Sequence, residues 1–115
     1  MLNLGKEFTK AEIEEPVVAE FELACNVTRL SSYNAQMCFT DKKVYLVPFL
    51  PNDILFFDAI AFEYSEVVSY GRKLLAGYEI HLADGSKVSL ANVFGKMRAA
   101  ITEELDYHCK EQSNA

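Results

Sequence analysis

The chain has 115 residues, of which 50% are hydrophobic and 12% aromatic, and its 17 acidic and 11 basic side chains give a formal net charge of -6. This length fits one small domain that buries roughly 65% of the surface of its unfolded chain, and the hydrophobic content excludes a disordered chain. The acidity argues against a nucleic-acid partner, because phosphate binding needs a basic surface.

Targeting and cysteine patterns place the chain in the cytoplasm. The first residues lack the positive region and long apolar run of a secretory signal, and acidic residues interrupt every apolar run before it reaches the ~20 residues of a transmembrane segment. Cys25, Cys38 and Cys109 are odd in number and form no C-x-x-C pair, which predicts neither a disulfide framework nor a metal site. Cys25 lies in an apolar alternation and is predicted to be a core residue.

The amino-terminal segment differs from the rest of the chain in composition and hydrophobic pattern. Residues 6–16 are acidic and weakly helix-forming, and Pro16 ends them, so residues 1–16 are interpreted as an acidic lead-in. Its carboxylates Glu12, Glu14 and Glu15 have no calcium-loop spacing and are predicted to be solvated. The domain is expected to span residues 17–111, followed by a tail over residues 112–115.

From residue 17 onward the hydrophobic pattern has a period of two. A first strand is predicted from Val17, with one apolar face and one wet face, and Ser31 to Asn34 reads as a turn. A second strand surrounds Met37 and Phe39, and a third runs from Val44 to Pro48. The apolar residues of the first strand are Phe21, Leu23, Cys25 and Val27.

Four further strands and a helix complete the chain. A fourth strand is predicted through Ile60, Phe62 and Tyr64, and a fifth over residues 67–70. The last hairpin, from residue 78 to residue 90, keeps its apolar side chains together only with a three-residue loop of Ala83, Asp84 and Gly85. That loop sets Ile80 opposite Val88 and Tyr78 opposite Leu90, and it predicts a left-handed conformation for Gly85.

The closing element is predicted to be an amphipathic helix capped by Asn92. Its apolar stripe comprises Phe94, Met97, Ile101 and Leu105, with Lys96, Arg98, Glu103 and Glu104 facing water. About seven short strands followed by one helix predict a mainly β fold, a small antiparallel barrel or bent sandwich capped by the helix.

Three stretches of this pattern resemble GRAM domains and bacterial pleckstrin-homology-like (PH-like) domains. Residues 35–47 are similar to the family's apolar, Thr-Asp-Lys, apolar strand pair, residues 62–67 to its strand before a short polar turn, and residues 78–88 to its last hairpin. The resemblance covers roughly residues 17 to 108 and implies an interaction module that is not an enzyme.

The same resemblance argues against binding of a phosphoinositide headgroup. Members that bind one use basic side chains in loops that correspond here to residues 31–34, 48–58 and 83–86. None of these loops contains Lys or Arg, and only Arg29 and Lys87 flank them. The basic pairs Lys42-Lys43 and Arg72-Lys73 lie in predicted turns and are interpreted as solvated charge.

An unusually apolar segment between the third and fourth strands is the candidate interaction patch. It contains Phe49, Ile54, Leu55, Phe56 and Phe57. In one interpretation Asn52 or Asp53 caps a helical turn that plugs the mouth of the barrel. In the other, the segment meets a protein partner, a second copy or a membrane surface, since aromatic anchors are typical of interfaces.

No catalytic pattern is present. His81 and His108 have no sequence signature that pairs them with a nucleophile, and both are predicted to be surface residues. No nucleotide-binding glycine motif occurs, and no cofactor is expected. The sequence therefore predicts a non-catalytic module that acts through protein contacts or self-association. The alternative is a lipid- or small-ligand-binding domain whose pocket is lined by Tyr33, Phe49, Phe56 and Phe57, and peripheral membrane contact fits either reading.

Overall fold

The structure, a computed structural model, describes residues 1–5, 8–26, 33–48 and 59–113. In these ranges eight strands form one antiparallel sheet with the order β1-β5-β4-β3-β2-β8-β7-β6. The strands are β1 (Leu2–Gly5), β2 (Ala19–Asn26), β3 (Tyr33–Phe39), β4 (Lys43–Pro48), β5 (Ala59–Glu63), β6 (Val67–Arg72), β7 (Tyr78–Leu82) and β8 (Lys87–Ala91). The helix α1 (Gly95–Ser113) and two 3-10 turns, η1 (Lys10–Glu12) and η3 (Tyr64–Glu66), complete the described part.

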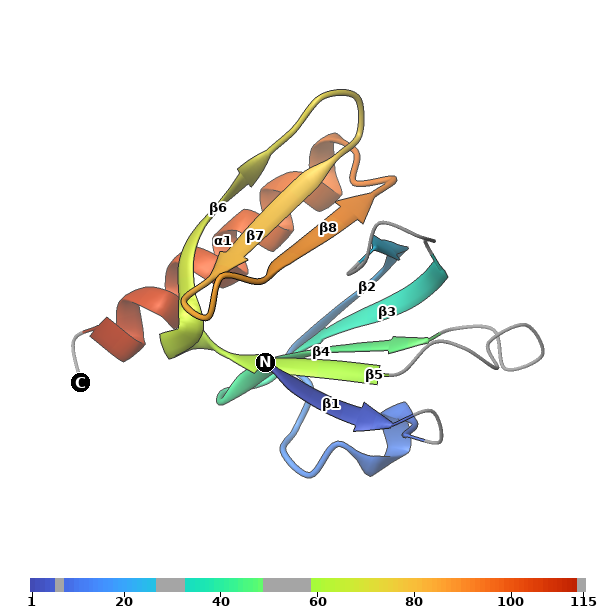
Figure 1. The fold of residues 1–115 in the computed structure, drawn as a ribbon, viewed down its shortest axis with the longest axis vertical. Helices are drawn as coiled ribbons and strands as arrows, with labels where there is room; N and C mark the ends of the chain where they lie inside the picture. The colour runs from blue at the N-terminus through green and yellow to red at the C-terminus, as the bar shows by residue number, and fades with distance from the viewer. Residues whose placement is uncertain (6–7, 27–32, 49–58, 114–115) are drawn as a thin grey trace.

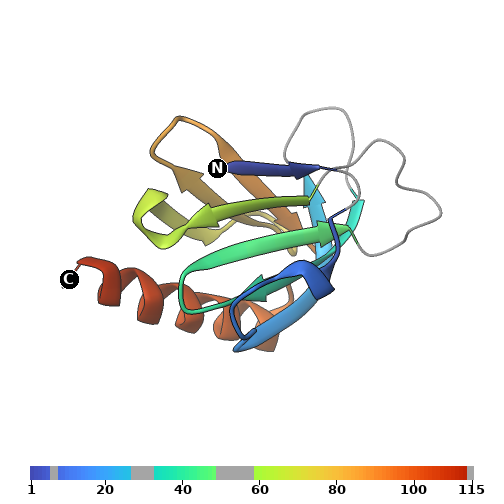
Figure 2. The ribbon, with the colours of Figure 1, turned by 90° about the horizontal axis from the view of Figure 1, so that it is seen from below.

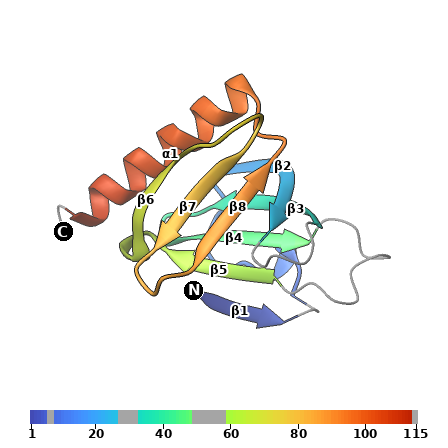
Figure 3. The same cartoon turned by 45° about the horizontal axis from the view of Figure 1, so that its top comes forward.

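The sheet curls into two halves that enclose the core. Figure 1 shows β1 to β5 in one half and β6 to β8 in the other, joined where Cys25 of β2 pairs with Leu90 of β8. The helix packs Ile101 and Leu105 into the space between the halves, and it runs beside β6 (Figure 2 and Figure 3). The predicted mainly β fold with a closing helix is confirmed, and β1 is a strand that the sequence did not predict.

The last hairpin has the predicted register. Ile80 pairs with Val88 and Tyr78 pairs with Leu90, and all four side chains lie in the main core. Gly85 has φ +90°, so the three-residue loop places it in the left-handed region that favours glycine. The apolar pattern alone was sufficient to select this register, because a shift by one residue would turn the core side chains to the opposite face.

A second apolar cluster lies on the outer face of the first half. Its buried members are Cys38, Tyr45, Val47 and Ala61. The cluster is covered by side chains of the amino-terminal segment, namely Leu4, Phe8, Ile13 and Val17. Residues 44–47 of β4 are consequently buried in succession on both faces of the sheet. Strand periodicity could not predict this burial, because the cover comes from a segment distant in the sequence.

The segment before residue 17 is therefore attached to the sheet over much of its length. β1 pairs with β5, with Asn3 opposite Ile60. The predicted solvation of the acidic segment is wrong for Glu15, whose carboxylate accepts hydrogen bonds from Tyr45 Oη (2.7 Å) and Thr40 Oγ (3.0 Å). Tyr45 and Thr40 are buried, and the Glu15 carboxylate supplies the hydrogen-bond acceptor that their hydroxyls need there.

Two strand boundaries differ from the prediction. Tyr33 and Asn34 were expected in a turn but begin β3, where they pair with Cys25 and Ala24 of β2. Tyr64 was expected in the fourth strand but begins η3, where it remains buried. In both cases tertiary contacts outweigh local preference.

The helix begins later and extends further than the stripe suggested. Asn92, the predicted cap, lies three residues before Gly95 with φ 63°, and Phe94 precedes the helix with its carbonyl accepting the Arg98 N–H. The placement of Phe94 in the core is wrong, since its side chain is 66% exposed. The surface assignment of His108 is also wrong, because the side chain is only 5% exposed. Ile101 and Leu105 are fully buried, as predicted.

Candidate functional site

The candidate patch proposed from the sequence lies outside the described residues. This applies to Phe49, Ile54, Leu55, Phe56 and Phe57, and with them to most of the alternative apolar pocket. The loop of residues 83–86 is described and carries a carboxylate, Asp84, that accepts hydrogen bonds from the backbone and hydroxyl of Ser86. These bonds lower the pKa of Asp84, so this loop presents a negative charge rather than a phosphate-binding cation.

A groove of about 450 Å³ lies between the carboxyl-terminal half of α1 and the turn that joins β3 to β4. Its walls are Val18, Asp41, Glu103, Glu104, Tyr107 and His108, which we call the α1 groove. Three of these residues are carboxylates, none is Lys or Arg, and Val18 and Tyr107 are exposed apolar side chains at its surface. The groove therefore combines negative charge with apolar contact area.

His108 forms the base of the α1 groove. Its ring stacks on Tyr64 with the centroids 4.5 Å apart and the planes 11° apart, and it lies parallel to Phe39 at 6.4 Å. Its Nε2 donates to the Glu104 carboxylate at 3.2 Å, one helical turn earlier. These contacts hold the imidazole and the carboxylate in place beside the groove.

The opposite wall is fixed by hydrogen bonds around Thr40. Tyr64 Oη donates to the Thr40 carbonyl at 2.6 Å, and burial raises the pKa of the Tyr64 phenol. The Thr40 hydroxyl accepts the backbone N–H groups of Lys42 and Lys43 at 3.2 and 3.1 Å. This arrangement is a turn closed by a side chain, and it places Asp41 at a defined position opposite α1.

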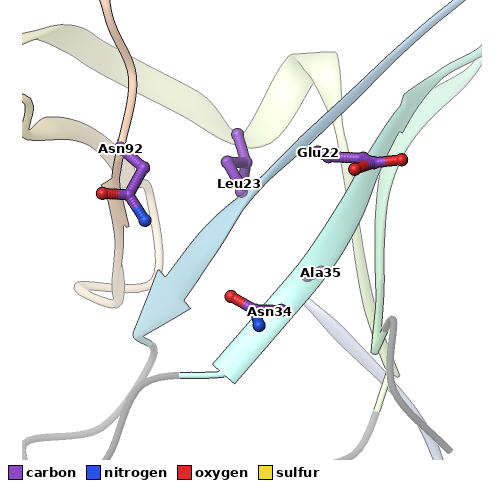
Figure 4. A pocket seen from close by; sticks show the side chains of 5 residues that line it. All are labelled: Glu22, Leu23, Asn34, Ala35 and Asn92. Atoms are coloured by element: carbon purple, nitrogen blue, oxygen red, sulfur yellow. The ribbon is translucent and has the colours of Figure 1, made fainter.

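A second hollow of about 250 Å³ lies beside the pairing of β2 with β8. It is lined by Glu22, Leu23, Asn34, Ala35 and Asn92, and Figure 4 shows that these come from β2, β3 and the segment after β8. Glu22 and Leu23 extend to opposite sides of β2, as neighbours in a strand do. Its volume is below the usual range for ligand pockets, which makes the α1 groove the stronger candidate.

The described residues offer little for catalysis. They contain no group of three His, Cys, Asp or Glu side chains placed to hold a metal ion. Burial raises the pKa of the Cys38 thiol to about 11, so this thiol is protonated at neutral pH and is a poor nucleophile. His81, predicted on the wet face, is half-exposed beside Glu79 at 3.1 Å. Among the described residues, no helix is long and apolar enough to cross a membrane.

Sequence reasoning missed the α1 groove because its walls come from separate elements. One signal was available: His108 follows Ile101 by seven positions and Leu105 by three, and it thus continues the buried stripe of the helix. The opposing residues Val18 and Asp41 carry no such signal. Their position depends on the β3–β4 turn and on the Val18 N–H bond to the Phe39 carbonyl at 2.8 Å.

A scan against protein-family models and a search of curated proteins found no match to this sequence. The fold is nevertheless shared with solved structures. A pleckstrin homology domain in solution is similar with a TM-score of 0.68 and 7% identity over 90% of this chain and 94% of that one. The carboxyl-terminal PH domain of pleckstrin, in complex with D-myo-Ins(1,2,3,4,5)P5, gives a TM-score of 0.63 and 15% identity over 81% of this chain and 98% of that one.

Two further structures extend this comparison. The carboxyl-terminal domain of an unknown protein from Leishmania infantum has a TM-score of 0.66 and 14% identity over 83% of this chain and 84% of that one. A linker-DH/PH fragment of p115-RhoGEF gives a TM-score of 0.66 at 8% identity, with the match covering 85% of this chain and 30% of the longer fragment. At these identities the likeness concerns the fold, and the fold of this chain is PH-like.

Proposed function

We propose that the chain is a non-catalytic PH-like interaction module that binds a protein segment carrying basic and apolar side chains in the α1 groove. The observation that supports this most is the composition of the groove: three carboxylates beside Val18 and Tyr107, with no Lys or Arg in its walls. Lys or Arg side chains of a partner would pair with the carboxylates, and an apolar neighbour would cover the two exposed side chains.

The sequence favours a protein partner over a lipid headgroup. PH-like domains commonly mediate interactions with proteins or lipids, and the loops that correspond to a headgroup site lack Lys and Arg. A protein partner is therefore favoured over a phosphoinositide. The closer relationship to GRAM and bacterial PH-like domains, and a cytoplasmic location, remain predictions that belong to the same proposal.

Self-association is a second form of the same function, and it rests on the apolar segment. Phe56 and Phe57 would be its anchors, because buried aromatic side chains dominate interface energies. Sedimentation of the wild type and of Phe56→Asp and Phe57→Asp variants tests this form. A monomer mass for the wild type at all concentrations would exclude it.

The α1 groove is tested by titrating the isotope-labelled full chain with a short synthetic peptide of alternating Lys and Leu. We expect amide shifts concentrated at Asp41 and at residues 103–108. A Glu103→Arg variant should bind at least about fivefold more weakly, since loss of one close opposite charge alone costs on the order of 1 kcal/mol and the arginine adds repulsion. Both the charge and the apolar surface contribute, so Tyr107→Ala should weaken binding as well.

The matched control is Glu22→Arg, which makes the same charge change at the exposed residue in the second hollow. It should leave the affinity within the error of the wild type. Equal weakening by Glu22→Arg and Glu103→Arg would show that the peptide responds to net charge alone, and equal binding of a Glu-Leu peptide would contradict the proposal.

A further inference from the structure

The connection between β6 and β7 exposes two neighbouring leucines. We call residues 73–77 the β6–β7 tip. Leu74 is 92% exposed and Leu75 is 96% exposed, so neither side chain contributes to the core. Leu75 also has φ 61°, in the left-handed region that disfavours a leucine and favours glycine or asparagine. Two large apolar residues therefore stand where folding gains nothing from them.

The tip is held in position by backbone hydrogen bonds. Lys73 N–H donates to the Gly77 carbonyl at 2.9 Å, and Gly77 N–H donates to the Leu74 carbonyl at 3.2 Å. The Ala76 carbonyl accepts the Val93 N–H at 2.9 Å, which ties the tip to the start of α1. Figure 1 shows the β6–β7 connection and the beginning of α1 at the same end of the molecule.

The segment before α1 adds a third apolar side chain to this end. Phe94 directly follows Val93, which bonds to the tip, and it is 66% exposed. None of these three residues lines either of the two hollows described above. Exposed apolar side chains outside a hollow can enter the interfacial region of a bilayer, which needs no matching pocket.

Basic residues flank these apolar side chains. Arg72 and Lys73 lie at the base of the tip, and Lys96 and Arg98 lie in the first turn of α1. Glu79 is the acidic neighbour that contacts this group, with an oxygen 3.4 Å from Lys73 Nζ. The chain as a whole has a net charge of -6, so this end is more basic than the rest of the chain. Charge complementarity thus points to an anionic surface.

We propose that the β6–β7 tip and Phe94 dock this protein on an anionic lipid bilayer. Leu74, Leu75 and Phe94 would enter the interfacial region, while the four basic side chains would lie against the headgroups. The residues of this contact differ from those of the α1 groove and from those of the three loops that correspond to a headgroup site. It requires no specific headgroup, only negative surface charge and accessible acyl chains.

The chain contains no tryptophan, so a single introduced indole reports on this end alone. We expect the emission of Leu75→Trp to shift to the blue on addition of phosphatidylcholine vesicles that contain phosphatidylserine. Pure phosphatidylcholine vesicles should give a smaller shift. Val68→Trp is the matched control, because Val68 is an exposed apolar residue of β6 away from the tip, and its emission should not change.

Co-sedimentation with the same vesicles measures affinity. The double variant L74S/L75S should lose at least tenfold in binding, Lys96→Glu should lose about fivefold or more, and V68S should bind as the wild type does. Leu75→Gly separates binding from folding, since it removes the apolar side chain and the left-handed strain together. We expect Leu75→Gly to bind more weakly with a melting temperature that is unchanged or higher.

Several outcomes would overturn the proposal. These are the absence of wild-type binding to both kinds of vesicle, equal binding by the wild type and L74S/L75S, and a blue shift of Val68→Trp equal to that of Leu75→Trp. A concentration-dependent dimer that L74S/L75S abolishes, without any vesicle binding, would make a second copy the occupant and would also contradict it. Each of these results leaves the α1 groove unaffected.

Discussion

Glu15 shows how one carboxylate can join two parts of the chain. It lies in the amino-terminal segment and accepts hydrogen bonds from Tyr45 of β4 and from Thr40. Burial alone would raise the pKa of Glu15, but these hydrogen bonds outweigh it and lower the pKa below its usual 4.5. Burial and the same carboxylate raise the pKa of Tyr45. The charged form of Glu15 is therefore the form that the folded state favours.

We expect Glu15→Gln to lower the free energy of unfolding by about 1 kcal/mol at neutral pH, the usual contribution of such hydrogen bonds. Since the folded pKa lies below the unfolded value of 4.5, this stabilisation is present above pH 4.5 and disappears as the pH falls through the folded pKa. Urea denaturation of both proteins across this range measures the difference. Equal stability at neutral pH would contradict the role assigned to Glu15.

At the scale of the element, α1 depends on a narrow buried stripe. Ile101 and Leu105 are fully buried, and Met97 is partly buried against the same core. We expect Ile101→Ala to cost about 2 to 5 kcal/mol, because the sheet cannot collapse fully into the cavity. Chemical denaturation measures this, with the exposed Glu103→Ala as a control that should change stability by less than about 0.5 kcal/mol. If Ile101→Ala lowers the free energy of unfolding by less than about 0.5 kcal/mol, the stripe does not support the fold.

Elements with a strong local pattern could be predicted from the sequence. The last hairpin had one register that kept Tyr78, Ile80, Val88 and Leu90 together, and the structure has that register. Phe94 misled the helix prediction because its spacing fits the stripe although it precedes the helix. Periodicity describes a face and cannot distinguish a core residue from one placed just before the first turn.

The candidate site was less predictable than the elements. His108 continues the stripe of α1, yet its burial depends on Tyr64 of η3 and Phe39 of β3, which are distant from it in the sequence. The exposed leucines at 74 and 75 could not be distinguished from core residues by composition. Their exposure follows from the tight turn that closes β6 and β7, in which Gly77 N–H bonds to the Leu74 carbonyl.

The whole molecule depends on a cover that strand patterns do not indicate. The amino-terminal segment lies over the second cluster, where Phe8 stacks on Tyr45 with centroids 5.9 Å apart and planes 2° apart. Cys38 in this cluster is fully buried, and burial raises its thiol pKa to about 11. Residues 1–16 were interpreted as a lead-in to a domain that begins at residue 17, and these contacts give that boundary a direct test.

We expect a chain that begins at Val17 to be destabilised by a few kcal/mol, because the segment packs the partly buried side chains of Leu4, Phe8 and Ile13 on the second cluster. Each contributes less than the roughly 1.5 to 3 kcal/mol of a fully buried side chain, before its ordering entropy is subtracted. Cys38 reports on this loss in a Cys109→Ser background, since removal of the cover exposes its thiol to a labelling reagent. Phe8→Ala should accelerate labelling to a smaller extent, and Leu2→Ser, which changes an exposed side chain of β1, should leave it unchanged. If the shortened chain keeps both the wild-type stability and the wild-type labelling rate, the domain begins at residue 17 and the cover is dispensable.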